Sequence, residues 1–153
     1  MLNHSDLEKI RKEVDDFFRK MTIDIEFESI QQKDETLLID IRVGEPQVLI
    51  GEKGQTLFDI QHLLSAILKR QIAEKFFLDF DINDYKKKKI DYLKELARSM
   101  ADEVVLAKKE KILPAMTAYE RRVIHMELAN RGNVMTESVG EEPERRLIIK
   151  PYP

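Results

Sequence analysis

The chain has 153 residues, of which 42% are hydrophobic and 36% are charged, and its formal net charge is −3. Five glycines and five prolines are too few for a disordered chain, and the lack of cysteine excludes disulfides, thiolate metal sites and cysteine nucleophiles. No apolar run is long enough to span a membrane and the first twenty residues do not form a signal peptide, so we expect a cytoplasmic location.

The first 83 residues predict one small α+β unit with the element order αββααβ. Ser5 is expected to cap the first helix, because apolar residues recur after it with helical spacing. Alternating residues predict a β-hairpin, and proline suits the start of the short helix. The expected elements are a helix to about residue 20, strands at 22–29 and 36–43, a short helix at 46–50, a long helix ending near residue 75, and a strand at 76–82.

The remaining residues, 84–153, predict a second small α+β unit. A helix is expected from Tyr85 to about Lys109, and Pro114 ends this pattern. Thr117 and Glu120 have the spacing of a capping box at the start of another helix. Two strands at 134–140 and 145–153 should follow, joined by the turn EEPE. The run KKKK at 86–89 is either a solvated helical face or the start of a basic track for nucleic acid.

The segment VLIGEKGQTL sets Gly51 and Gly54 around Glu52 and Lys53, between a short and a long helix. A tight turn here would present unpaired N–H groups at a helix N-terminus, which favour phosphate, and glycine would let a sugar-phosphate chain approach. This loop within an αββααβ unit is the arrangement of a KH module, which clamps single-stranded nucleic acid. The simpler interpretation is a helix–helix turn that needs glycine for positive φ angles.

The segment YERRVIHMEL places Arg121 and His125 four residues apart, hence on one side of a helix, with Arg122 beside them. A guanidinium and an imidazole on a largely apolar surface suit phosphates and stacked bases. The simpler interpretation is a histidine at the rim of a core and an arginine paired with a nearby acid. No nucleophile, metal-ligand set or cofactor loop can be assembled, so we expect no enzyme, no metal and no cofactor.

Three sequence blocks in the same order resemble the Jag family, also called SpoIIIJ-associated proteins. LIGEKGQTL is similar to the KH loop, LPAMTAYERRVIHMEL to the region of an Arg-x-x-x-His signature, and TESVGEEPERRLII to the closing strand–turn–strand. The resemblance implies a KH domain at 1–83 and an Arg-x-x-x-His domain at 84–153 that binds single-stranded nucleic acid. We expect the chain to lack the extra N-terminal domain that many members carry.

The hypothesis is therefore a bacterial RNA-binding protein that grips single-stranded RNA, with single-stranded DNA left open, at two sites. The resemblance also implies that a smaller KH protein can work alongside it. The alternative is a protein-interaction adaptor with a KH-like fold and incidental nucleic-acid affinity, which the acidic first half favours. The expected RNA-binding residues are Gly51, Glu52, Lys53 and Gly54, with Val48, Ile50 and Leu57 along a groove for bases; those of the second site are Arg121, Arg122 and His125.

Overall fold

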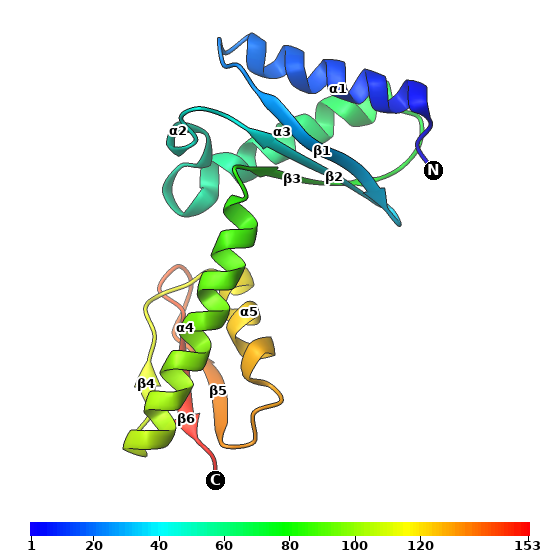
Figure 1. Ribbon diagram of the computed structural model, residues 1–153. Coiled ribbons are helices and arrows are strands. Elements are labelled where there is room, and N and C mark those ends of the chain that lie inside the picture. The colour runs from blue at the N-terminus through cyan, green and yellow to red at the C-terminus, as the bar shows by residue number, and fades with distance from the viewer. The chain divides into compact units, whose positions relative to one another are not determined.

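The computed structural model describes residues 1–153 and divides the chain into two compact units, Met1–Lys86 and Lys87–Pro153. Each unit has its own three-stranded sheet and its own hydrophobic core (Figure 1). The expected boundary lay after Asn83. Both units combine helices with a small sheet, so the predicted α+β class is confirmed. No helix has the length and apolar character that crossing a membrane requires.

The first unit contains a β-hairpin and a parallel third strand. Its elements are α1 (His4–Arg19), β1 (Glu26–Lys33), β2 (Thr36–Arg42), α2 (Gln47–Ile50), the short 3-10 helix η1 (Glu52–Gly54), α3 (Gln55–Gln71) and β3 (Phe77–Ile82). Strand β2 is central, since it pairs with β1 antiparallel and with β3 parallel. The expected hairpin, short helix and third strand are confirmed, but the first strand of the hairpin lies four residues later than the expected 22–29. The long helix ends at Gln71 instead of near residue 75.

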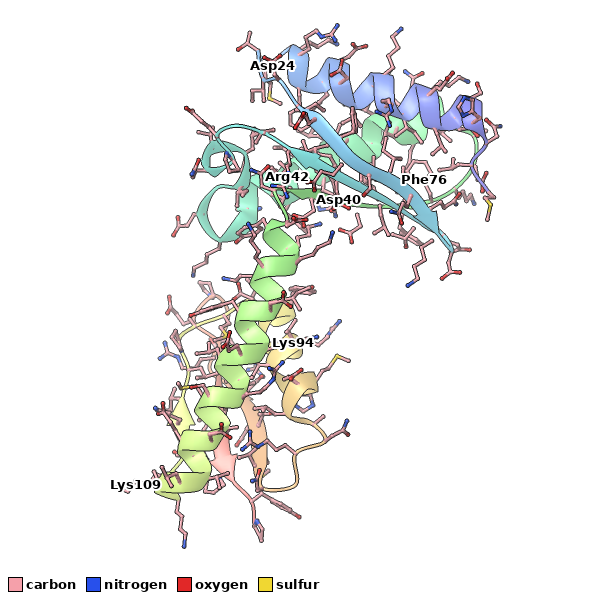
Figure 2. All side chains as sticks on the ribbon, in the orientation of Figure 1. Asp24, Asp40, Arg42, Phe76, Lys94 and Lys109 are labelled. Carbon is pink, nitrogen blue, oxygen red and sulfur yellow. The ribbon has the colours of Figure 1, made fainter.

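One face of this sheet carries the core of the first unit. Strand β2 alternates, so that Leu37, Ile39 and Ile41 are fully buried while Asp40 and Arg42 lie on the opposite face (Figure 2). The buried face is covered by α1 and α3. The Phe18 ring of α1 stacks on Phe80 of β3, with 5.9 Å between ring centroids. Burial of this stripe fixes both helices on the sheet.

The cap of α1 corrects one expectation. Asn3, and not Ser5, is the N-cap: its side chain accepts from the Asp6 N–H, and the Asp6 carboxylate accepts from the Asn3 N–H. Ser5 lies inside the first turn. Both Asn3 and Ser5 begin a capping-box pattern. The helix starts after Asn3 because Leu2 is anchored just before it: its side chain is buried and its N–H donates to Gln32.

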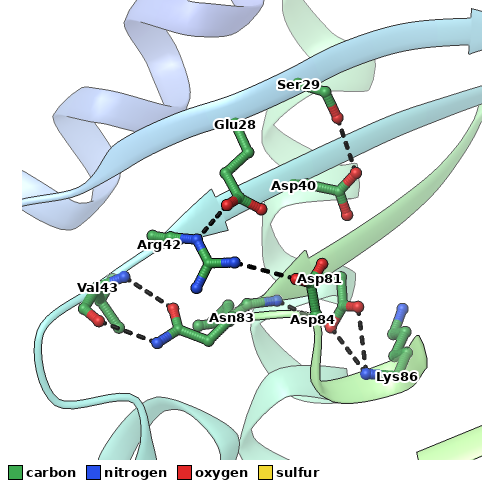
Figure 3. A network of polar contacts seen from close by, with 10 residues as sticks. Glu28, Ser29, Asp40, Arg42, Val43, Asp81, Asn83, Asp84 and Lys86 are labelled. Atoms are coloured by element: carbon green, nitrogen blue, oxygen red, sulfur yellow. Dashed lines mark hydrogen bonds and ion pairs between the residues drawn. The ribbon is translucent and has the colours of Figure 1, made fainter. Parts of the chain in front are cut away.

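A polar network joins the end of β2 to the connection that leads from β3 into α4 (Figure 3). The Asn83 side chain accepts from the Val43 N–H at 2.9 Å and donates to the Val43 carbonyl at 3.1 Å. The buried Asp81 carboxylate accepts from the N–H groups of Ile82 and Lys86. Burial raises the pKa of Asp81, against the opposing effect of these hydrogen bonds.

The second unit packs two helices on an antiparallel sheet with strand order β4-β6-β5. Thr117 and Glu120 form the predicted capping box at the start of α5. The two-residue strand β4 was not anticipated, because it lies beside the proline that ends the helical pattern. The elements are α4 (Tyr85–Ala107), β4 (Lys111–Ile112), α5 (Ala118–Leu128), β5 (Val134–Val139) and β6 (Arg146–Pro151).

The core of the second unit lies between α4, α5 and β6. Helix α4 contributes only a narrow stripe, Leu93, Ala97, Ala101 and Val104, whereas Lys94 and Lys109 lie outside this stripe (Figure 2). The remaining core residues that are almost fully buried are Leu113, Ile124, Leu128, Leu147 and Ile149. Small alanines on α4 allow its backbone to approach the layer beneath.

Candidate nucleic-acid interface

The loop between α2 and α3 turns on three residues in the left-handed region. Gly51 has φ 72°, Lys53 has φ 54° and Gly54 has φ 79°. The Gly51 N–H closes α2 by donating to the Gln47 carbonyl, and Gly54 is the N-cap residue of α3 without a side-chain cap. The loop therefore brings the N-terminus of a 17-residue helix to the surface beside Lys53.

Both glycines are also required by contacts within the chain. A Cβ atom at Gly51 would lie 2.1 Å from Oγ1 of Thr56, and a Cβ at Gly54 would lie 2.8 Å from Cε1 of Tyr85. Positive φ angles add to this requirement. The lack of a side chain at these positions thus has a full local explanation, independent of any ligand.

The residues expected beside the loop fall into three groups by exposure. Glu52 and Lys53 are exposed, and no hydrogen bond or ion pair holds the Lys53 side chain. Ile50 is half-buried. Leu57 is only 2% exposed and belongs to the core, so its side chain has no free surface for a base.

A surface pocket of about 370 Å³ lies on the N-terminal side of the loop. Its apolar lining includes Val48, which is 74% exposed, and the expected groove residues Ile50 and Leu57 are not part of it. Two carboxylates, those of Asp24 and Glu45, also line it. The other apolar lining residues are Ile23, Val43 and Leu49.

Arg121 is buried, with 7% of its surface exposed. Its Nη1 donates to the Met116 carbonyl at 2.5 Å, and its Nη2 forms an ion pair of 2.7 Å with Oε1 of Glu142 in the turn between β5 and β6. The guanidinium is thus bonded to groups of the chain itself. This is the arrangement expected if Arg121 is an arginine paired with a nearby acid.

Two neighbours of Arg121 on α5 are exposed. His125 lies one turn further along the helix, with its Nδ1 hydrogen-bonded to Oγ1 of Thr136 on β5 at 2.6 Å. Arg122 has neither a hydrogen bond nor an ion pair. The exposed side of α5 therefore presents a free guanidinium and an imidazole that is fixed by one nitrogen.

Much of the remaining basic charge is paired with carboxylates. Within the lysine run, Lys86 pairs with Asp79 at 2.7 Å and Lys89 lies 3.6 Å from Glu120. Other ion pairs in the second unit join Arg98 to Glu127, Arg131 to Asp102 and Lys150 to Glu137. The hydrogen bond from Lys150 holds the pKa of Glu137 below its usual range. This pairing reduces the positive charge available to a ligand.

Sequence reasoning did not identify three residues of this region: Met116, Thr136 and Glu142. Thr136 and Glu142 contact α5 only through the tertiary fold, whereas Met116 lies just before this helix and accepts locally from Arg121. The acidic turn EEPE was a usable signal for Glu142, because a buried arginine requires a carboxylate or carbonyl partner.

Most of the second unit matches a known domain family. Residues 91–151 match the family model of the R-3-H domain. The matched range contains Arg121, Arg122 and His125, together with Thr136 and Glu142. The exposed face of α5 and the ion pair beneath it therefore lie within the segment that matches this domain.

Most of the chain is also similar to bacterial proteins named RNA-binding protein KhpB. It is 33% identical over 129 residues to that of Clostridium symbiosum, covering 84% of this chain and 58% of the relative. It is 32% identical over 123 residues to that of Bacillus subtilis strain 168, covering 79% and 59%. The chain thus spans less than two thirds of the length of these relatives.

Proposed function

We propose that this chain is a bacterial protein that binds single-stranded RNA through two surfaces, the loop 51–54 and the exposed side of α5. The observation that carries the proposal is the R-3-H domain match over a helix that exposes Arg122 and His125. The names of the relatives support RNA as the ligand. A cytoplasmic location is part of the same proposal.

In this proposal the first unit, from residue 1 to about residue 83, is a KH domain. Support comes from the element order and from a loop whose left-handed turn precedes the N-terminus of α3. Lys53 would supply the cation for a phosphate, and the backbone N–H groups of the loop would supply donors. Glu52 would face away from the phosphate, because two anions at this distance repel.

The bases would lie in the pocket beside α2 instead of over Leu57. The exposed side chain of Val48 offers an apolar contact surface, and the carboxylates of Asp24 and Glu45 can accept hydrogen bonds from base amino groups. Ile50, half-buried at the end of α2, would contact the sugar next to the loop.

In the second unit Arg122 would bind phosphate and His125 would donate from its free ring nitrogen or stack on a base. Thr136 fixes the ring in place. Two weak sites on one chain would raise the affinity for a strand long enough to reach both. Single-stranded DNA is a second ligand to be compared with RNA.

The loop is tested by changing Lys53, because substitutions of Gly51 or Gly54 would strain the fold. Lys53→Asn and Lys53→Asp have nearly the same shape, and both residue types tolerate the left-handed region. With a dye-labelled single-stranded RNA at two salt concentrations, we expect Lys53→Asp to bind more weakly than Lys53→Asn by at least about threefold. Equal affinities would reject contact between this loop and phosphate.

The second surface is tested by Arg122→Ala in the same assay. We expect weaker binding and a salt slope lower by about one phosphate contact. Lys69→Ala is the control, since Lys69 is exposed on α3, outside both surfaces. If wild-type protein freed of nucleic acid does not bind single strands, the proposed function is wrong.

A protein-interaction role is the second candidate, and the exposed side of α3 favours it. Phe58 is 51% exposed, and its ring meets that of His62 edge to face at 4.6 Å. Leu63 is 56% exposed on the next part of the same helix. A smaller KH protein is one partner that this apolar surface would suit. A stable complex that survives nuclease treatment, lost in Leu63→Glu, would support this role.

A further inference from the structure

Arg121 forms one ion pair, with Glu142, and this pair is shielded on one side only. Arg121 is buried, whereas the Glu142 side chain is 55% exposed. The acidic member of the pair is therefore the one that reaches the solvent. A ligand that approaches Arg121 from the solvent would encounter the negative charge of Glu142 first.

The guanidinium joins α5 to two segments outside this helix, of which only the β5–β6 turn is distant in sequence. Arg121 belongs to α5, Met116 to the segment that precedes this helix, and Glu142 to the β5–β6 turn. Met116 extends the connection, because its N–H donates to the Arg145 carbonyl at 3.1 Å. Arg145 in turn donates from Nη1 to the Gly140 carbonyl at 2.6 Å. The turn is thereby held from both of its ends.

The turn itself is unsuited to phosphate. Glu141 and Glu144, on either side of Glu142 and Pro143, are also exposed. A phosphate at Arg121 would have to displace the ion pair of 2.7 Å with Glu142, in a turn that carries two further exposed carboxylates. Arg122, one position later and exposed, meets none of these obstacles.

We propose that Arg121 is a positioning residue that makes no contact with nucleic acid, and that Glu142 is its partner in docking α5 onto the β5–β6 turn. This inference rests on the proposed function of the α5 surface. The two-point bond of Arg121 fixes the rotation of α5 about its axis. That rotation places Arg122 toward solvent and keeps His125 over Thr136.

The experiment combines Arg121→Lys with Glu142→Ala and Glu142→Gln, and measures RNA affinity well below each melting temperature. Lysine keeps the charge but lacks the rigid pair of nitrogens that bond Met116 and Glu142 separately, so Arg121→Lys should bind about tenfold more weakly with an unchanged salt slope. Glu142→Ala should cause a similar loss of RNA affinity. The double variant should lose little more, because both substitutions break the same interaction.

Glu142→Gln is the conservative control. Its amide oxygen can still accept from Nη2, so we expect it to retain wild-type affinity within about threefold. A loss of affinity in fully folded protein, rescued by glutamine, separates positioning from a purely stabilising role. The amide NMR signals of Arg122 and His125 should shift in Glu142→Ala and return toward wild type in Glu142→Gln.

Two results would overturn the inference. If Arg121→Ala lowers the salt slope by about one, Arg121 contacts phosphate directly. If Glu142→Ala tightens binding, the carboxylate competes with phosphate for a ligand-binding arginine. Failure of the proposed function is distinguishable, because the wild type would then not bind RNA at all, while the coupling of Arg121 and Glu142 would still be measurable in melting temperature.

Discussion

Gly54 lies so close to the ring of Tyr85 that a Cβ atom would stand 2.8 Å from its Cε1 atom. The loop that carries the candidate phosphate site is therefore packed against the first residue of α4. This contact makes the glycine a structural requirement as well as a candidate ligand-binding residue. Gly54 also has φ 79°, which an L-residue adopts with strain.

Gly54→Ala should accordingly lower the free energy of unfolding by about 1–3 kcal/mol. Gly44→Ala is the matched control, because nothing lies within 4 Å of a Cβ at Gly44, and we expect a change within about 0.5 kcal/mol. Urea titration followed by circular dichroism measures both. Equal stabilities of the two variants would contradict the contact with Tyr85.

Substitutions of two adjacent leucines on α3 should differ sharply in their effect on stability. Leu64 is fully buried between the helices and the sheet, so Leu64→Ala leaves a cavity. This variant should lower the free energy of unfolding by about 3–5 kcal/mol. Leu63→Ala removes the same atoms from a side chain that is mostly exposed and should cost less than about 1 kcal/mol. Chemical denaturation of the two variants side by side tests the orientation of the helix; similar losses would mean a different orientation.

The start of α1 gives a second matched pair. Asn3→Ala removes the cap that accepts from the Asp6 N–H and should cost about 1 kcal/mol. Ser5→Ala, within the first turn, should change stability by less than about 0.5 kcal/mol. Thermal unfolding of both variants decides between the two capping patterns, and a larger loss for Ser5→Ala would restore Ser5 as the cap.

Asp81 should produce an unusual pH dependence. Its raised pKa means that the native state holds the proton more tightly than the unfolded chain does. Its contribution to stability is therefore greatest below the unfolded value of 3.8 and is lost as pH rises through the native pKa. Asp81→Asn cannot ionise, so it does not lose stability as the pH rises. Its amide oxygen can still accept from the Ile82 and Lys86 N–H groups.

We therefore expect the stability of Asp81→Asn relative to wild type to increase as the pH rises from about 3.5 to 7. Urea unfolding at several pH values in this interval measures the difference. Asp81→Ala, which removes the acceptor as well, should be destabilised throughout the interval. A relative stability of Asp81→Asn that falls with rising pH would contradict the raised pKa.

The helix and the loop that carry the candidate site residues could be predicted from the sequence, but the burial and the partners of these residues could not. The spacing of Arg121 and His125 correctly indicated a shared helix. Which of the basic residues is available to a ligand depends on Glu142, twenty-one positions from Arg121. Similarly, Leu57 follows the glycine loop closely, yet the helical turn directs its side chain into the core.

The sequence by itself determined the helices, the hairpin, the capping box at Thr117 and the left-handed loop at 51–54, because these depend on neighbours within about four residues or on a simple alternation. Only the tertiary structure decided that Thr56 and Tyr85 occupy the space beside the two glycines, that Arg121 is buried and that Arg122 is free. Burial and ion pairing depend on which distant segments come together, and that is determined by the packing of the whole unit.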